Sequence, residues 1–426
     1  MPLSIVVGAQ WGDEGKGRIV DLLATASDAV ARFGGGANAG HTVRVGEKTF
    51  KLSIVPSGVI AGVRDCIIGP GTAVSPAQFA AELDELERGA VDTSRVWLSD
   101  LAHLILPYHL QLDRADEAER RAGALGTTGK GIGPAYVDRV GRVGLRAGDL
   151  RDLPHAKQII AARGRALAAQ GIQVDADAET RALERLAERI VPHVKDTVRL
   201  LFDLLRGGKR VLAEGAQGSL LDVTLGTYPY VTSSVTVAGG AAAGLGVGPR
   251  DVDHVIGVAK AYETRVGAGP FPTELADSTG DDLRARGHEF GVVTGRPRRC
   301  GWLDVPALRY AAVVNGFSHL ALTKLDVLDT FESILVCDQY EGAAAAASWP
   351  FVLSSNPRPR YATLAGWRSP IGGARTWEAL PAAARAYVEF IEQAVGVPIA
   401  YVSVGPERSQ IVVRPHAPIA PAAVRG

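Results

Sequence analysis

The sequence lacks a charge bias, a membrane-length apolar run and any pairing pattern among its cysteines. Its 46 acidic and 46 basic side chains balance, whereas a general nucleic-acid or membrane-surface role favours a basic stripe or tail. It shows neither a basic-then-apolar amino-terminal leader nor an apolar run of spanning length. Cys66, Cys300 and Cys337 are odd in number, far apart and without metal-type spacing. Such cysteines suit a reducing compartment. We therefore expect a cytoplasmic protein that binds neither nucleic acid nor membrane.

Lysine is also scarce. Only nine of the 46 basic residues are lysines. Four of the nine fall in the glycine-rich or loop motifs described below: Lys16, Lys130, Lys260 and Lys324. A lysine kept in a chain that so prefers arginine is a weak sign of function, but it points to the same segments as the motifs.

Glycine is abundant, and its clusters follow apolar runs. They lie at residues 8–17, 34–40, 126–133, 214–218, 239–248 and 265–269. Further short strands that end at polar loops are expected at 209–213, 319–323 and 399–403. This repeated order of strand, turn and helix predicts an α/β fold. We expect a mainly parallel central sheet with helices on both faces and a core like that of P-loop NTPases. Ligands gather at the carboxyl ends of such strands.

We expect one large α/β catalytic domain over residues 1–426, with two additions. Apolar residues recur at three- and four-residue steps over 179–206, which predicts a helix. With the Ala- and Arg-rich segment before it, this stretch predicts a helical subdomain over residues 151–206 that serves as packing scaffold. Residues 341–378 carry an alanine run, then prolines, glycines and tryptophans. They predict a peripheral excursion with little chemistry.

The first motif with chemistry is residues 8–17, Gly-Ala-Gln-Trp-Gly-Asp-Glu-Gly-Lys-Gly, directly after the apolar run 3–7. A strand that runs into a glycine-rich turn presents backbone N–H groups to a phosphate. Lys16 can pair with that anion, and Asp13 can hold a metal or move a proton. The spacing is not that of a Walker A loop, and Gly17 stands where Ser or Thr would hold Mg²⁺. An acid inside a phosphate loop suggests catalysis.

The second motif is residues 33–42, Phe-Gly-Gly-Gly-Ala-Asn-Ala-Gly-His-Thr. Asn38 offers an amide, Gly40 a bare carbonyl, and His41 a group that titrates near neutrality. A single histidine is usually structural, and that alternative stays open. An acid at Asp13 and a histidine on an adjacent loop can divide the base and acid roles across one substrate.

The third motif is residues 125–134, Leu-Gly-Thr-Thr-Gly-Lys-Gly-Ile-Gly-Pro, with Arg139 and Arg142 shortly after it. Hydroxyls, backbone N–H groups and cations together suit a monophosphate. A mobile surface loop has nearly the same composition. The fourth motif is Glu-Gly-Ala-Gln-Gly at 214–218, with a Tyr-Pro-Tyr-Val-Thr-Ser-Ser stretch downstream. Its Gln217 and the downstream Thr232 can read a base or a phosphate, although ordinary turn chemistry explains both.

The fifth motif is Val-Thr-Gly-Arg-Pro-Arg-Arg at 293–299. Three arginines on one loop predict binding of carboxylate or phosphate, because the guanidinium fork matches both anions. A solvated charge run is the alternative. The sixth motif is Thr-Lys-Leu-Asp at 323–326, at the end of an expected strand. It is similar to the guanine-reading signature of GTP-binding proteins, in which the aspartate accepts from the N1–H and amino groups that adenine lacks.

Together these blocks resemble the adenylosuccinate synthetase family, whose members join IMP and L-aspartate with GTP in AMP biosynthesis. The resemblance is nearly continuous from residue 4 to about residue 334 and resumes at 401–408. It is carried by long, specific blocks: Gln10 to Gly17, Asn38 to Thr42, Gly126 to Thr128, Lys260 to Tyr262, Arg265 to Glu274 and Thr294 to Asp304. The departures are few: Pro297 in the arginine loop, Val235 and Val237 after Ser234, and the alanine run 343–347.

The resemblance implies a division of labour among these residues. Asp13 would take the proton from N1 of IMP and, with the Gly40 carbonyl, hold one Mg²⁺ per subunit. His41 would act as the acid that assists transfer of the GTP γ-phosphoryl group to O6. Aspartate would then displace phosphate from 6-phosphoryl-IMP. Arg142 would reach the IMP site of a partner subunit, which implies a homodimer.

The resemblance also implies the binding sets. GTP would be held by Gly12, Asp13, Glu14, Gly15, Lys16, Gly17, Arg18, Gly40, His41, Thr42, Arg298, Lys324, Leu325, Asp326, Ser403, Val404 and Gly405. IMP would be held by Asp13, Glu14, Gly15, Lys16, Asn38, Ala39, Gly40, His41, Thr128, Arg142, Gln217, Thr232 and Arg296. Aspartate would be held by Val292, Val293, Thr294, Gly295, Arg296, Pro297 and Arg298.

Two other classes of protein compete with this enzyme. A regulatory GTP-binding switch needs a phosphate loop and a Lys-x-Asp element, but it also needs Walker A spacing and has no use for an acid in that loop. A purine-binding protein without catalysis would tolerate changes at Asp13 and His41.

Overall fold

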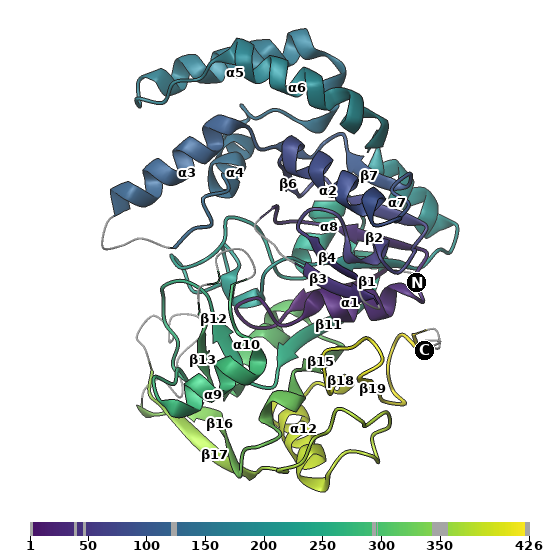
Figure 1. Ribbon diagram of the computed structural model, residues 1–426, viewed down its shortest axis with the longest axis vertical. Helices are drawn as coiled ribbons and strands as arrows, with labels where there is room; N and C mark the ends of the chain where they lie inside the picture. Colours follow the sequence, from purple (N-terminus) through teal and green to yellow (C-terminus); the bar gives the residue numbers. More distant parts are fainter. Residues whose placement is uncertain are drawn as a thin grey trace.

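The computed structural model describes residues 3–37, 41–45, 48–120, 126–291, 295, 297–342 and 357–421, with backbone alone at 41–45 and 48–49. Its main feature is a ten-stranded sheet that runs through the middle of the molecule (Figure 1). In spatial order the strands are β19 (Ile411–Val413), β18 (Ile399–Ser403), β15 (His319–Thr323), β11 (Val252–Lys260), β1 (Leu3–Gly8), β10 (Val211–Glu214), β2 (Ala29–Arg32), β5 (Asp65–Ile68), β7 (Val96–Ser99) and β9 (Val194–Lys195).

Every pairing in this sheet is parallel except that of β18 with β19. The prediction of a mainly parallel sheet is therefore confirmed. Strand β1 lies near its centre, between β10 and β11, and all six of its residues are buried. A short, continuously apolar strand of this kind is typical of a parallel sheet covered on both faces.

Helices cover both faces, as the sequence predicts. The described helices are α1 (Lys16–Ala24), α2 (Pro76–Arg88), α3 (Pro107–Arg120), α4 (Ile132–Gly141), α5 (Leu153–Ala168), α6 (Ala176–Ile190), α7 (Thr197–Arg206), α8 (Gly239–Leu245), α9 (Ser278–Gly287), α10 (Val305–Asn315) and α12 (Ala382–Val395). From β1, Ile5 and Val7 pack into the core that contains α8, α10 and α12. Val6 packs into the opposite core with Ile19 and Leu23 of α1.

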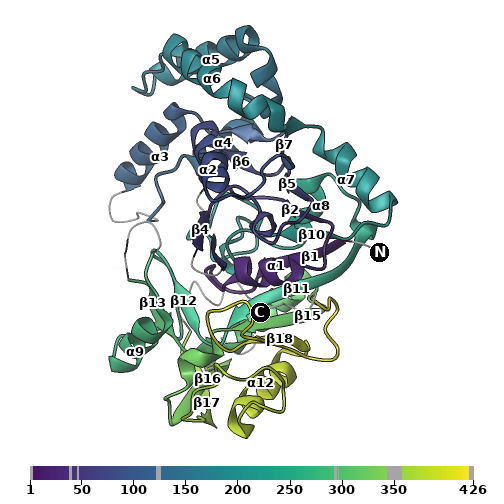
Figure 2. The same ribbon diagram turned by 45° about the vertical axis from the view of Figure 1, so that its right-hand side comes forward.

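A third core lies at the end of the sheet that carries β5 and β7. Phe79 and Leu83 of α2 pack there with Leu98 of β7, Ile160 of α5 and Leu183 of α6. Figures 1 and 2 show α5 and α6 side by side beyond this end of the sheet, far from the carboxyl-terminal strands. None of the described helices is both long and apolar enough to cross a membrane.

The predicted helix over 179–206 is wrong in one respect, because the structure divides it in two. Helix α6 ends at Ile190, and α7 begins at Thr197. Between them Pro192 lies in a short 3-10 turn, and β9 joins the edge of the main sheet. Proline ends the first helix because it has no N–H for the helical ladder. Asp196 starts the second, since its side chain accepts a hydrogen bond from Arg199 N.

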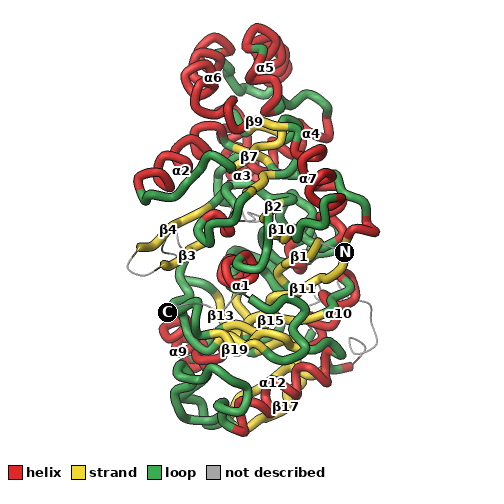
Figure 3. The backbone as a smooth tube through the Cα atoms, turned by 90° about the vertical axis from the view of Figure 1, so that its right-hand side faces the viewer, coloured by secondary structure: helices red, strands yellow, loops and turns green. Residues whose placement is uncertain are grey.

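Among the described residues there are four smaller sheets besides the main one. Three of them are two-stranded and pair β12 (Glu263–Arg265) with β13 (Arg299–Gly301), β3 (His41–Val45) with β4 (Lys48–Leu52), and β6 (Ala73–Val74) with β8 (His103–Leu104). Figure 3 shows β3 and β4 lying side by side, away from the main sheet. The fourth is three-stranded, with β16 (Ser333–Tyr340) between β14 (Leu303–Asp304) and β17 (Pro359–Ala365). The strand β17 belongs to the segment 341–378, of which residues 343–356 lie outside the described residues.

Candidate active site

The loop between β1 and α1 is shaped to receive an anion. Strand β1 ends at Gly8 and α1 begins at Lys16. Gly12, Asp13 and Gly15 have φ values of 88°, 59° and 87°. Gly15 stands at the N-cap of α1 and supplies no side-chain cap, so the first N–H groups of the helix have no side-chain acceptor there. Such N–H groups and the positive end of the helix dipole favour a phosphate.

The Glu14 side chain holds the shape of this loop through hydrogen bonds to its backbone. Its fully buried carboxylate accepts hydrogen bonds from the backbone N–H of Gln10 at 3.1 Å and of Gly12 at 2.9 Å. It also pairs with Lys16 Nζ at 2.6 Å. The Lys16 ammonium is therefore buried and neutralised in this structure. Thr323, at the end of β15, donates to the Glu14 carbonyl at 2.6 Å, which ties the loop to the next part of the site.

The loop after β10 forms a second wall. A Cβ on Gly8 would lie 2.5 Å from both Glu14 carboxylate oxygens and 2.6 Å from the Gln217 carbonyl, so the two loops pack without a gap. Ser219 Oγ donates to the Gly8 carbonyl at 2.6 Å. Gln217 has a φ of 54°, and its buried Oε1 has no hydrogen-bond partner among the described residues. An orphaned amide oxygen beside a phosphate loop is suited to a ligand N–H.

Asp13 and Arg298 meet at the rim of this loop. Arg298 Nε lies 2.9 Å from Asp13 Oδ2, and its Nη1 donates to the buried Glu289 carboxylate at 2.7 Å. The contact with Asp13 is an ion pair and not an aligned hydrogen bond, because Nε has no aligned acceptor among the described residues. Burial lowers the pKa of Arg298, but Asp13 and Glu289 outweigh it and leave that pKa above its ordinary value. The structure thus joins the first motif to the fifth.

The sixth motif, residues 323–326, lies at the carboxyl end of β15, next to the carboxyl end of β18. Lys324 directly follows β15, and its Nζ pairs with Glu289 Oε1 at 3.1 Å and with the Gly287 carbonyl. Asp326 lies in the 3-10 turn Leu325–Leu328 that follows. Burial raises the pKa of its carboxyl above the ordinary value. A carboxylate set in a buried loop beside a lysine can accept two ligand N–H groups.

Residues 403–410 are held against α1. Arg18 Nη1 donates to Ser403 Oγ at 2.7 Å and to the Gly405 carbonyl. Arg408 forms a two-point ion pair with Asp21, with Nε 2.6 Å from Oδ2. The Arg18 guanidinium, which the resemblance assigns to GTP, is therefore bonded to the loop of Ser403 and Gly405. Burial lowers the pKa of Arg18 to about 10.

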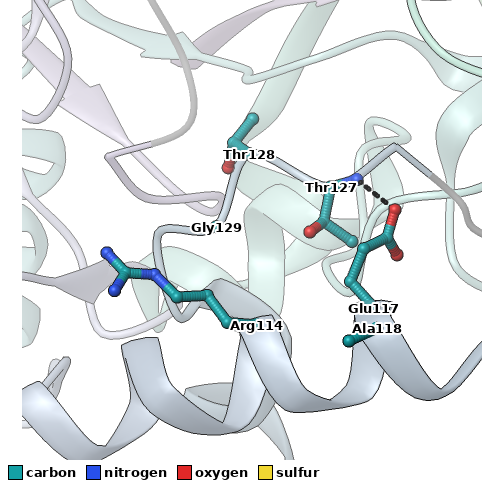
Figure 4. Close-up of a pocket in the computed structure, with 6 residues that line it drawn as sticks. All are labelled: Arg114, Glu117, Ala118, Thr127, Thr128 and Gly129. Atoms are coloured by element: carbon teal, nitrogen blue, oxygen red, sulfur yellow. Dashed lines mark hydrogen bonds between the residues drawn. The ribbon is translucent and has the colours of Figure 1, made fainter.

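The third motif borders a separate hollow. A recess of about 420 Å³ is lined by Arg114, Glu117, Ala118, Thr127, Thr128 and Gly129 (Figure 4). Glu117 accepts from the backbone N–H of Gly126 at 2.6 Å, and Thr128 is exposed beside it. Lys130 Nζ donates to the Ala37 carbonyl at 2.7 Å. This bond ties the third motif to the second.

Several predicted residues lie outside this description. Asn38, Ala39, Gly40, Val292, Val293, Thr294 and Arg296 are not among the described residues, and His41 and Thr42 are described only by their backbone in β3. Thr232 is half-buried, and its backbone N–H donates to the Leu221 carbonyl. Arg142, at the C-cap of α4, is exposed.

The sequence reasoning missed Glu289. This fully buried carboxylate binds Lys260, Lys324 and Arg298 together. The sequence signal for it is an acid close before a loop with three arginines. Both the scarcity of lysine and the block Lys260 to Tyr262 draw attention to Lys260 in the sequence.

Comparison with known proteins assigns the family. A model of the adenylosuccinate synthetase family matches residues 5–412. The chain belongs to this family. It is 49% identical over 424 residues to the adenylosuccinate synthetase of Moorella thermoacetica, with 97% of this chain and 99% of that protein covered. It is 46% identical over 427 residues to that of Neisseria gonorrhoeae, with 97% and 98% covered.

Two solved structures are similar to this chain. The fully ligated adenylosuccinate synthetase from Plasmodium falciparum matches with a TM-score of 0.91 and 36% identity, over 97% of this chain and 100% of that one. Cyanophage S-2L succinoaminodeoxyadenylate synthetase, bound to dGMP and dATP, matches with a TM-score of 0.62 and 20% identity, over 98% and 97%. The second likeness shows the fold alone.

Proposed function

We propose that this site carries out the reaction of its family through Asp13. Adenylosuccinate synthetases are ligases that join IMP and L-aspartate with GTP and release GDP and phosphate. The observation that carries the proposal is a carboxylate set within the anion-binding turn before α1 and paired with Arg298 at 2.9 Å. A GTP-binding switch has no use for a proton acceptor at that position.

The proposed chemistry has two steps. In the first, Asp13 takes the proton from N1 of IMP as O6 attacks the γ-phosphorus of GTP and the bond to GDP breaks. His41 acts as the acid that assists transfer of the γ-phosphoryl group to O6. In the second, the amino group of aspartate attacks C6, the C6–O bond breaks with release of phosphate, and the proton that the amino nitrogen loses leaves on the phosphate. Phosphoryl transfer needs positioning and charge neutralisation above all, and the loop N–H groups and Lys16 would supply both.

The donor set also fits Mg²⁺. Glu14 is engaged by the loop and by Lys16, whereas the Asp13 side chain is 37% exposed at the rim. Mg²⁺ is commonly held by one or two carboxylates together with substrate phosphates. Asp13 and the Gly40 carbonyl would hold it here. When bound, it supplies positive charge against the β- and γ-phosphates.

The selectivity for GTP would come from the loops after β15 and β18. Asp326 would accept from the guanine N1–H and amino groups, with Lys324 and Leu325 alongside. Ser403, Val404 and Gly405 would close the other side, in the position that Arg18 gives them. IMP would lie between Gln217, Thr232 and the loop of Thr128, and aspartate would be captured by the loop 292–298.

The surface around Arg142 supports a homodimer. Arg142 stands in a left-handed conformation with a φ of 61° and is exposed. Three valines on and beside α4 are exposed with it: Val137 at 65%, Val140 at 79% and Val143 at 42%. Exposed apolar side chains gathered on one helix mark an interaction surface. A second copy seated there would receive Arg142 in its IMP site.

Two broader expectations also remain proposals. We infer a cytoplasmic location, because the three cysteines are free and buried. We infer one catalytic domain because the segments proposed to bind GTP, residues 8–17, 323–326 and 403–405, come from distant parts of the chain. They meet at the same end of one parallel sheet.

An omission assay tests the proposed function. The chain would be mixed with IMP, GTP, L-aspartate and Mg²⁺, and the ultraviolet change of purine substitution at C6 would be followed. The expected result is a signal that disappears when any one substrate is left out or when the metal is chelated. A signal that survives omission of aspartate or GTP would overturn the proposal.

A further inference from the structure

Glu289 is a buried carboxylate that four side chains share. The residue is fully buried. Its Oε1 binds Lys260 Nζ at 2.9 Å, Lys324 Nζ at 3.1 Å and Tyr262 Oη at 2.5 Å. Its Oε2 accepts from Arg298 Nη1 at 2.7 Å. The carboxylate therefore connects Lys324, which follows β15, with Arg298 through its two opposite oxygens.

The same residue closes the base of the arginine loop. The Arg298 backbone N–H donates to the Glu289 carbonyl at 2.9 Å, and Phe290 forms an antiparallel bridge with Pro297. Glu289 and Arg298 are thus bonded both by backbone and by side chain. The base of this loop is therefore tied to the Glu289 carboxylate by direct contacts.

Charge explains why this carboxylate stays ionised. Burial raises its pKa, but Lys260, Lys324 and Arg298 outweigh burial and hold that pKa far below the ordinary value. Three cations surround one anion in this group, and Asp13 neutralises part of the excess through Arg298. The surplus positive charge favours the arrival of anionic substrates at Lys324 and Arg298, which are the two cations with solvent exposure, at 31% and 10%.

We propose that Glu289 is a positioning residue that couples the binding of GTP to the binding of aspartate. The proposal rests on the proposed function, in which Lys324 serves guanine and Arg298 serves aspartate and GTP. Because both cations are bonded to one carboxylate, a ligand that fixes Lys324 also fixes the plane of Glu289. It thereby fixes Arg298, so the second ligand meets a guanidinium that is already held in place.

The test is a binding linkage with Glu289→Gln. Calorimetry would give the Kd of a non-hydrolysable GTP analogue in the presence of IMP, with and without saturating L-aspartate. A positioning role predicts that aspartate tightens the analogue about fivefold or more in the wild-type chain, within the usual range of such couplings. In Glu289→Gln the ratio should fall below about twofold, because the amide carries no charge to hold both cations.

Glu274→Gln is the matched control. Glu274 pairs with Arg299, the neighbour of Arg298, with Oε1 2.7 Å from Nε, and does not touch the Glu289 group. This control should keep the wild-type ratio. A wild-type ratio near one, or an undiminished ratio in Glu289→Gln, would overturn the proposal. A role in stability alone would weaken both binding constants in Glu289→Gln and leave their ratio unchanged.

Tyr262→Phe covers the case in which Glu289→Gln does not fold. It removes the 2.5 Å hydrogen bond to Oε1 and keeps the ring and every charge. The linkage ratio should fall by at least about twofold, which corresponds to the lower end of the net worth of one hydrogen bond. An unchanged ratio in a folded Tyr262→Phe would overturn the proposal. The omission assay on the wild-type chain does not depend on Glu289, so failure of the proposed reaction would be recognised separately.

Discussion

Gly218→Ala is expected to disable the site although Gly218 is not itself a proposed ligand. Gly218 lies where the loop after β10 meets the loop after β1. An added Cβ would lie closer than 3.0 Å to the Gln10 carbonyl oxygen and the Gly12 nitrogen, and 2.5 Å from Glu14 Oε1. The φ of Gly218 is −139°, which alanine adopts freely. The whole effect therefore comes from steric conflict.

The size of the effect follows from these distances. Two of the three crowded atoms belong to the backbone, so no rotamer change relieves them, and the anion-binding loop must shift by about 0.5–1 Å. Overpacking of this kind costs about 1–3 kcal/mol of stability. A displacement of about 1 Å at a reacting group reduces the rate by about a hundredfold. We expect kcat/KM to fall 30- to 300-fold, about 2–3.4 kcal/mol.

Initial rates and thermal melting would be measured together with Gly239→Ala as control. Gly239 begins α8 in the described structure, is exposed, and has no atom within 4 Å of an added Cβ. The control should keep its rate and melt at the wild-type temperature or slightly above it. If Gly218→Ala keeps kcat/KM within twofold of the wild type, the close packing of the two loops is not what positions the site.

Three further predictions concern guanine, the dimer and pH. Asp326→Asn should weaken GTP binding about ten- to a hundredfold, since hydrogen bonds to a charged group are worth about 1.5–3 kcal/mol; competition with ATP that still favours GTP to the wild-type degree would contradict it. Arg142→Leu should raise the KM for IMP about tenfold or more, the usual loss for one charge-assisted hydrogen bond; unchanged kinetics at all protein concentrations would count against the shared site. Burial raises the pKa of Glu179 from 4.5 to about 7, with Asp175 adding to it. The Glu179 carboxyl thus lowers the free energy of unfolding as pH rises from about 4.5 to 7. Glu179→Gln should then stabilise the chain by about 1–3 kcal/mol more at pH 8 than at pH 5, measured by urea unfolding, and an equal effect at both pH values would refute it.

The strands and the ligand loops could be predicted because each is a local pattern. The apolar runs at 319–323 and 399–403 form β15 and β18 as predicted. The predicted strand 209–213 overlaps β10, and its bounds differ from those of β10 by at most two residues. Buried parallel strands are short and continuously apolar, so the signal needs no knowledge of the partners. The prediction of one helix over 179–206 failed because the apolar periodicity continues through Pro192. Only the pairing of β9 with β7 fixes the break between the two helices.

Side-chain partners across the molecule could not be predicted. Lys16 was read as a free phosphate ligand, yet in this structure it is paired with Glu14. Arg18 was assigned to GTP, and its guanidinium binds the loop near Ser403, 385 residues away in sequence. The convergence on Glu289 likewise depends on the ends of β11 and β15 lying side by side. Contacts of this kind are set by the order of strands in the sheet, which no single segment encodes.

Asp13→Asn tests the central claim most directly. The substitution keeps the size of the side chain and removes its capacity to accept a proton near neutral pH. The rate of adenylosuccinate formation should fall by at least about a thousandfold, with the melting temperature close to that of the wild type. A variant that still turns over at the wild-type rate with all three substrates would contradict the account.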